Sequence, residues 1–185
     1  MKVMWILDFL PPVFARRLGL SAQASGSWVG SLQAALPAGA LELTVCAFSP
    51  ALTAPCRQVM DGVTYLGLPA GDRPALEQAL ADEAPDLIQL FGTENDHAPW
   101  VLEGFDPQKV LVYIQGLAGP CGEHMADGLP PRFLRRQPLK EALARRTGGL
   151  TVRGHRQRFL ERGEKERRVL AAARQILGRT DWDRA

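Results

Sequence analysis

The apolar run Leu87-Ile88-Gln89-Leu90-Phe91 constrains the fold of this chain more than any other stretch. Pro85-Asp86 precedes the run and Gly92-Thr93-Glu94 follows it, so residues that favour turns bound it on both sides. A short apolar run with such limits predicts a buried strand that stops abruptly. Because segments with helical patterns flank the run, we expect a parallel strand whose sheet carries helices on both faces.

The same alternation of strand-like and helix-like segments extends along the whole chain. Further strands are predicted at residues 2–9, 41–48, 63–68, 109–116 and 175–178. Helices are predicted over 27–36, 72–84, 95–103, 133–146 and 155–173, with irregular structure over 11–26, 50–57 and 119–131. In the 72–84 helix, Asp72-Arg73-Pro74 marks the first turn, and the apolar stripe consists of Leu76, Ala79, Leu80 and Ala84. This alternation predicts an α/β fold, a Rossmann-like open parallel sheet with right-handed crossovers and helices on both faces.

The composition is that of one ordinary globular domain. The chain has 185 residues, of which 46% are hydrophobic, which is enough for a sizeable core and argues against disorder. No apolar run is long enough to span a bilayer, and the apolar N-terminus runs into Asp8 and Pro11-Pro12, which favours a first strand over a signal peptide. Cys46, Cys56 and Cys121 are an odd number without metal-ligand spacing, so we expect reduced thiols and a cytoplasmic protein.

The formal net charge of +2 conceals an uneven distribution. Residues 131–170 contain thirteen Lys and Arg against four Glu, a local net charge of +9, which leaves nine basic and sixteen acidic residues, or −7, for the rest. Such a segment is either a solvated helical face or a surface that meets an anionic partner, such as a phospholipid headgroup or a phosphorylated substrate. A nucleic acid is a weaker candidate, because the segment has only Phe133 and Phe159 for base stacking.

Polar residues follow two of the predicted strands at their carboxyl ends, where ligands bind in sheets of this kind. Thr93 and Glu94 follow the apolar run and can hydrogen-bond the hydroxyls of a ligand, although Glu94 can instead stabilise the start of the next helix. Gln115 and Gly116 end the next strand in the same manner. His97 lies in the predicted 95–103 helix, where a histidine is either structural or functional.

Gly26 and Ser27 open the first long helix. Gly26 would let a ligand approach the free backbone N–H groups of the helix N-terminus, which favour an anion or a sugar hydroxyl. Gly26 and Gly30 do not form a G-x-G-x-x-G motif, so a nicotinamide cofactor is poorly supported. Trp28 shares a helical stripe with Leu32 and is interpreted as a packing residue rather than a sugar platform. The sequence contains no P-loop, nucleophile triad or metal-ligand cluster.

Several short motifs, in this order and spacing, resemble the N-terminal half of the family 4 glycosyltransferases, which have the two-Rossmann GT-B fold. They are Asp8-Phe9-Leu10-Pro11-Pro12, Gly26-Ser27-Trp28, Asp86-Leu87-Ile88-Gln89-Leu90-Phe91-Gly92-Thr93-Glu94, Ile114-Gln115-Gly116-Leu117 and Gly178-Arg179-Thr180-Asp181-Trp182-Asp183. The resemblance spans nearly the whole chain. It implies that residues 1–185 are one Rossmann-like N-terminal domain that holds the acceptor, and that a C-terminal nucleotide-sugar domain follows.

The resemblance also implies what this half lacks. The family's two-glutamate motif, with seven residues between the acids, belongs to the donor half, and no glutamate pair here has that spacing. No cofactor is therefore expected in this domain, and the nucleotide-sugar donor is expected in the full-length enzyme. Many relatives have His-Gly where this chain has Gln115-Gly116, and an amide has no usable pKa, so Gln115 could assist catalysis only by hydrogen bonding. Thr180 resembles the N-cap of a helix that the chain end interrupts.

Taken with the charge pattern, the resemblance predicts the acceptor-binding half of a sugar-nucleotide-dependent, retaining glycosyltransferase of polysaccharide biosynthesis, inactive by itself. The acceptor would be a hydroxyl of a glycan, a lipid-linked molecule or a small molecule. Segment 131–170 would bring the protein to the inner face of the membrane. The alternative that the residues leave open is a stand-alone Rossmann-like module that binds a nucleotide or metabolite without catalysis.

Overall fold

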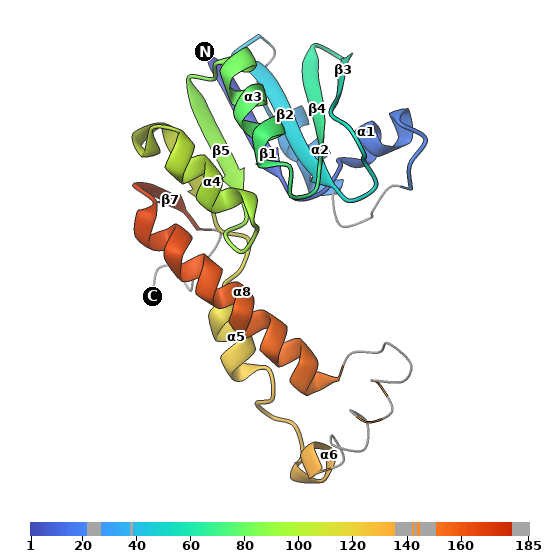
Figure 1. The fold of residues 1–185 in the computed structure, drawn as a ribbon, viewed down its shortest axis with the longest axis vertical. Helices are drawn as coiled ribbons and strands as arrows, with labels where there is room; N and C mark the ends of the chain where they lie inside the picture. The colour runs from blue at the N-terminus through green and yellow to red at the C-terminus, as the bar shows by residue number, and fades with distance from the viewer. Residues whose placement is uncertain (22–26, 38, 136–141, 143, 145–150, 179–185) are drawn as a thin grey trace.

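The computed structural model describes residues 1–21, 27–37, 39–135, 142, 144 and 151–178, and a seven-stranded sheet forms its centre (Figure 1). The sheet order is β3-β4-β2-β1-β5-β6-β7, and every neighbouring pair is parallel except β3 and β4. The strands are β1 (Lys2–Leu7), β2 (Glu42–Ser49), β3 (Cys56–Met60), β4 (Val63–Pro69), β5 (Leu87–Phe91), β6 (Val110–Tyr113) and β7 (Gln175–Leu177). The predicted α/β, Rossmann-like open sheet is confirmed.

Helices cover both faces of the sheet, as predicted. The helices are α1 (Pro12–Arg17), α2 (Ser27–Ala34), α3 (Arg73–Glu83), α4 (His97–Gly104), the 3₁₀ turn η2 (Pro107–Lys109), α5 (Ala118–His124), α6 (Pro131–Arg135) and α8 (Val152–Ala172). Side chains of a strand alternate between faces, so Trp5 and Leu7 of β1 pack with α1 and α2, whereas Met4 and Ile6 pack with α3, α4 and Val169 of α8. One central strand therefore contributes to two separate apolar cores.

The order of the strands creates a switch point between β1 and β5. From β1 the chain moves to β2 and then to β4 on one side, and it crosses back through α3 to β5 on the other side of β1. Ligands of open α/β sheets bind at the carboxyl ends of the strands where the order reverses. Asp8 follows β1 and Gly92-Thr93-Glu94 follows β5, so these residues flank the switch point.

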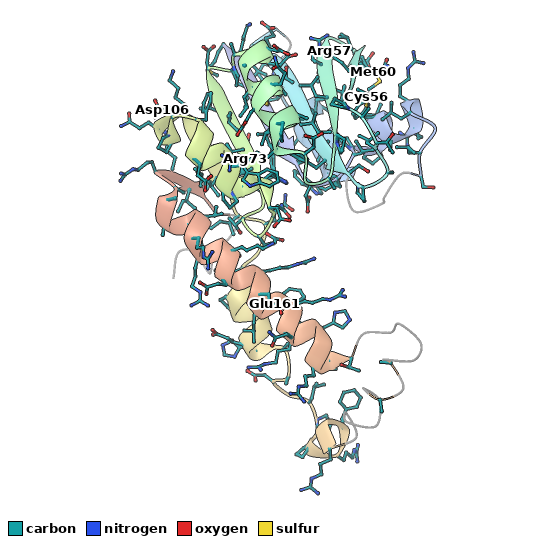
Figure 2. All side chains as sticks on the ribbon, viewed as in Figure 1. Cys56, Arg57, Met60, Arg73, Asp106 and Glu161 are labelled. Atoms are coloured by element: carbon teal, nitrogen blue, oxygen red, sulfur yellow. The ribbon has the colours of Figure 1, made fainter. Side chains whose placement is uncertain are left out.

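The edge of the sheet beyond β4 differs from the sequence prediction. Residues 50–57 were expected to be irregular, but Cys56 begins β3, which pairs antiparallel with β4 in a hairpin (Figure 2). Asp61 and Gly62 form the turn with φ of 50° and 77°, the positive values that a two-residue hairpin turn requires. Asp-Gly between two β-rich segments is a strong hairpin signal, and the sequence prediction overlooked it.

Two helices and one helix end also correct the prediction. The predicted irregular segment 11–26 contains α1, which Pro12 starts and the fully buried Phe14 attaches to the core. The predicted irregular segment 119–131 begins within α5. Ala84 was expected on the buried stripe of α3, but it is the exposed left-handed C-cap, with φ of 44°. Most of the predicted 133–146 helix, and Thr180, lie outside the described residues.

Helices α5 and α8 form a pair that runs away from the sheet (Figure 1). The backbones of α5 and α8 approach each other closely at glycines. A Cβ on Gly163 would lie 2.4 Å from the Gly119 Cα. A Cβ on Gly122 would lie 3.0 Å from the backbone nitrogen of Leu160.

None of the described helices is long and apolar enough to cross a membrane.

Candidate functional site

A cleft of about 310 Å³ lies at the carboxyl ends of β1 and β2. Asp8, Phe9, Phe48 and Ser49 are among the residues that line it. Asp8 belongs both to this cleft and to the switch point between β1 and β5. The cleft is therefore where the topology of the sheet favours a ligand.

Asp8 is the most perturbed carboxyl group of this region. It lies at the molecular surface, but the surrounding protein removes part of its hydration, and this desolvation raises its pKa. The Glu94 carboxylate raises the pKa of Asp8 further, and the Arg162 guanidinium of α8 lowers it. The charges of Glu94, from the β5–α4 loop, and Arg162, from α8, thus act on the carboxyl of Asp8, which follows β1.

Glu94 is held in place by the loop that follows β5. Its Oε2 accepts a hydrogen bond from the backbone N–H of Thr93 at 3.1 Å, and the residue is half-buried. Gly92 turns the chain with φ of 89°, and a Cβ there would lie 2.9 Å from the Asn95 Nδ2. The loop therefore requires glycine at this position, and the Thr93 N–H fixes the Glu94 carboxylate.

Thr93 lies in a different environment from its neighbour. It is fully buried, and its Oγ1 donates a hydrogen bond to Oε2 of Glu166 at 3.1 Å. Thr93 was expected to contact a ligand, but its hydroxyl is buried and already donates a hydrogen bond to Glu166. We therefore assign Thr93 to the framework that supports the site.

Glu166 is a buried carboxylate that the sequence analysis did not identify. Only 2% of the residue is exposed, and its carboxylate accepts backbone hydrogen bonds from Ala118 at 2.9 Å and Gly119 at 3.3 Å. These N–H groups belong to the first turn of α5, which follows β6. The N-terminus of α5, an anion site in principle, is thus occupied by a side chain of the protein itself. Nothing in the charged sequence around Glu166 distinguishes it from a solvated glutamate.

His97 lies behind the wall of the cleft rather than in it. It is 4% exposed and stacks on Phe48, with ring centroids 4.5 Å apart and ring planes 6° from parallel. Burial lowers the pKa of His97 to about 4, so the ring is neutral near pH 7. Its Nε2 is buried and has no hydrogen-bond partner among the described residues. His97 therefore supports Phe48, which lines the cleft.

Of the remaining predicted site residues, those that the structure describes follow β6 or begin α2. Gln115 and Gly116 are exposed just after β6. Gly26 lies outside the described residues, and Ser27 is the first residue of α2. The start of α2 is close to the switch point, because Trp28 contacts Phe91 at the end of β5 with ring centroids 5.2 Å apart. This contact agrees with the interpretation of Trp28 as a packing residue.

Asp8 and Arg162 are the site residues that the sequence analysis missed. Asp8 could have been found by extending to the first strand the argument applied to Glu94, because Asp8 is the first polar residue after β1. Arg162 gave no such signal, since it is one of many arginines in its segment. The three cysteines are free, and among the described residues no group of three or more His, Cys, Asp or Glu is arranged to hold a metal ion.

Comparisons of the chain with protein-family models, curated proteins and solved structures found no match.

Proposed function

We propose that the cleft beside Asp8 and Glu94 binds a hydroxyl-bearing acceptor, and that the chain is the acceptor-binding half of a sugar-nucleotide-dependent glycosyltransferase. The observation that carries this proposal is the cleft of about 310 Å³ at the carboxyl ends of β1 and β2, which is lined by Asp8, a carboxyl on which the charge of Glu94 acts. Carboxylates accept hydrogen bonds from sugar hydroxyls, and Phe9 and Phe48 supply apolar surface for the C–H groups of a sugar.

The charge of the cleft argues against a phosphate as its ligand. Asp8 and Glu94 repel an anion, and the α5 N-terminus, which could attract one, is occupied by Glu166. The phosphates of a nucleotide-sugar donor therefore find little support among the described residues. We accordingly expect donor contacts from a second domain and no turnover by residues 1–185 alone.

The raised pKa of Asp8 suits it for the acceptor hydroxyl that becomes the nucleophile. A carboxylate with a raised pKa is a better proton acceptor at neutral pH than an ordinary one. Asp8 would accept the hydroxyl proton as the oxygen bonds to the anomeric carbon, while the bond from that carbon to the phosphate oxygen of the donor breaks and the nucleotide leaves with its electron pair. Gln115, one strand further along, would contribute a hydrogen bond only.

Ligand-observed NMR on the whole chain tests the proposal. We expect saturation transfer to neutral monosaccharides and disaccharides, and a loss of about 10-fold in affinity for Asp8→Asn or Glu94→Gln, since each loses one charge-assisted hydrogen bond. The matched control is Glu161→Gln, an exposed carboxylate on α8 (Figure 2). Binding of ADP or UDP with no binding of any sugar would reject the acceptor site and favour the nucleotide-binding module.

The basic segment supports a second partner, an anionic lipid surface. Arg132 and Arg135 of α6 and Arg156 and Arg158 of α8 are exposed. Between residues 128 and 160 the sequence has a single acidic residue, Glu141. These arginines lie on α6 and on the first half of α8, elements that extend away from the sheet (Figure 1). We propose that this basic segment brings the protein to the inner face of the membrane, where a lipid-linked acceptor would be found.

Vesicle sedimentation tests the lipid surface. We expect binding to vesicles that contain phosphatidylserine, little binding to pure phosphatidylcholine, and loss of binding at high salt. A double substitution, Arg156→Glu with Arg158→Glu, should abolish sedimentation, whereas Arg57→Glu on the distant β3 should not. Tighter binding to a random oligonucleotide than to the anionic vesicles would instead indicate a nucleic-acid partner.

A further inference from the structure

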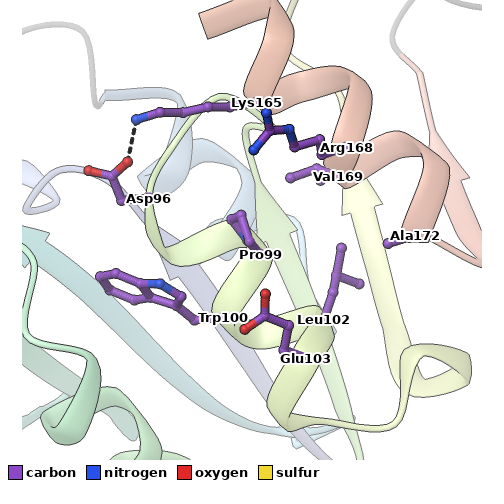
Figure 3. A pocket seen from close by; sticks show the side chains of 9 residues that line it. All are labelled: Asp96, Pro99, Trp100, Leu102, Glu103, Lys165, Arg168, Val169 and Ala172. Carbon is purple, nitrogen blue, oxygen red and sulfur yellow. Dashed lines mark hydrogen bonds and ion pairs between the residues drawn. The ribbon is translucent and has the colours of Figure 1, made fainter.

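A second groove, of about 410 Å³, lies between α4 and α8 and shares no residue with the cleft at the switch point (Figure 3). Its walls are mostly apolar. Val169 of α8 and Leu102 of α4 are buried there, and Trp100 is half-buried. The groove is large enough for a small molecule.

Short side chains keep this groove open. Pro99 of α4 and Ala172 of α8 both line it, and neither side chain is long enough to fill the space (Figure 3). The apolar side chains of the walls lack dispersion contacts on the side that faces the groove. A bound apolar group would supply these contacts. Trp100 is also a lining residue, and its flat indole offers a surface against which a flat ring can pack.

The charges at the rim differ in how well they are paired. Lys165 forms an ion pair with Asp96 across the top of the groove, and Glu103 accepts a hydrogen bond from Arg73 at 3.0 Å. Arg168 has a weaker contact, because its Nε lies 3.7 Å from Glu164 Oε1, beyond hydrogen-bond distance. Its guanidinium is therefore the rim cation with donors to spare for an anionic group.

From the apolar walls, the indole and this cation, we propose that the α4–α8 groove binds a small amphipathic ligand that has a flat fused ring and one anionic group. The ring lies against Trp100 and Val169, and the carboxylate or sulfonate accepts hydrogen bonds from Arg168. Guanidinium suits such oxyanions because it presents several donors in one plane. This site is independent of the function proposed for the switch-point cleft.

Titration of the whole chain with 1-anilinonaphthalene-8-sulfonate, a fused ring with one sulfonate, tests the proposal. Ala172→Trp fills the groove and should lower the affinity at least 10-fold. Because it removes one charge-assisted hydrogen bond, Arg168→Gln should lower it about 10-fold. The matched control is Arg167→Gln, since Arg167 also pairs with Glu164, at 3.1 Å, but does not line the groove.

A neutral probe of the same shape separates the ring from the anion. N-phenyl-1-naphthylamine should bind wild type and Arg168→Gln with equal affinity, and Ala172→Trp should weaken it as well. The proposal is overturned if the wild-type chain does not bind the sulfonate probe, or if Ala172→Trp binds it as wild type does while circular dichroism shows a native fold. An equal loss for Arg167→Gln and Arg168→Gln would likewise overturn it, because it would indicate diffuse electrostatic attraction.

Discussion

Two neighbouring parts of the carboxyl edge use the same chemical group in opposite ways. At the ends of β1 and β5, the carboxyl of Asp8 lies at the surface with its pKa raised, beside Glu94. At the start of α5, after β6, Glu166 is buried, and its carboxylate accepts three hydrogen bonds, from Thr93, Ala118 and Gly119. Glu166, which is buried and fully hydrogen-bonded, is part of the framework. Asp8, which is partly desolvated and repelled by the charge of Glu94, is available to a ligand.

This difference predicts that the carboxylate of Glu166 stabilises the folded state, whereas the ionised carboxylate of Asp8 destabilises it. Removing the Glu166 carboxylate should lower the free energy of unfolding, because its partners would lose their hydrogen-bond acceptor. Removing the Asp8 carboxylate should not lower it, because the ionised form of Asp8 is disfavoured in the folded state. Of four predictions given in decreasing order of expected effect, the first and the last test that contrast, and the other two test the packing around the two carboxylates.

The largest effect is expected for Glu166→Ala. The substitution leaves the Thr93 hydroxyl and two backbone N–H groups buried without an acceptor, which should lower the free energy of unfolding by about 4 kcal/mol. Urea denaturation followed by circular dichroism measures the loss. Glu164→Ala, on the exposed side of α8, is the control and should change stability by less than about 0.5 kcal/mol. Equal effects of the two substitutions would contradict a framework role for Glu166.

His97 should make the stability of the fold depend on pH. Its pKa of about 4 in the fold lies below the ordinary value of 6.5, so the unfolded chain binds a proton more readily between these limits. Stability should therefore be fully present above pH 6.5 and decrease as the pH falls toward 4, by up to about 3 kcal/mol.

The variant His97→Phe keeps the ring stacked on Phe48 and removes the titrating group. Its unfolding free energy should change less than that of wild type between pH 6.5 and 4. Identical pH profiles for the two proteins would show that another group is responsible.

A third prediction concerns the glycines that bring α8 against the start of α5. In Gly163→Ala the new Cβ would meet the Gly119 Cα at 2.4 Å, so the helices must separate. We expect a loss of about 2 kcal/mol, net of the better helix propensity of alanine. Gly30→Ala on α2, where a Cβ has no atom within 4 Å, should be neutral or stabilising by thermal denaturation. A stabilising Gly163→Ala would mean that the α5–α8 pair is looser than described.

The smallest effect, and one of opposite sign, is expected for Asp8→Asn. Because the fold raises the pKa of Asp8, its ionised form is less stable in the native state than in the unfolded chain. Replacing it should stabilise the protein by a few tenths of a kcal/mol near pH 7, since solvent screens an exposed group. The gain should vanish at about pH 3, where the carboxyl is protonated in both states. A destabilised Asp8→Asn would place Asp8 in the framework together with Glu166.

Short-range sequence patterns were enough to predict the architecture of the sheet. The apolar run at β5 gave the buried strand, and the alternation of segments gave the open parallel sheet. Asp72-Arg73-Pro74 correctly marked the start of α3, where the Asp72 side chain accepts a hydrogen bond from the Ala75 N–H at 3.0 Å. These features depend on residues a few positions apart, so a linear pattern contains them. The glycosyltransferase function and its acceptor remain predictions.

Only the tertiary structure shows which residues belong to the framework and which to the cleft. Thr93 and Glu94 are adjacent and polar at the end of one strand, and nothing in their sequence distinguishes their roles. Thr93 became structural because Glu166, 73 positions later, accepts its hydrogen bond, and the charge of Arg162, on the same helix as Glu166, lowers the pKa of Asp8. The physical reason is that burial and hydrogen-bond partners are set by packing between segments distant in the chain, whereas a sequence pattern reports only which side chains one segment carries.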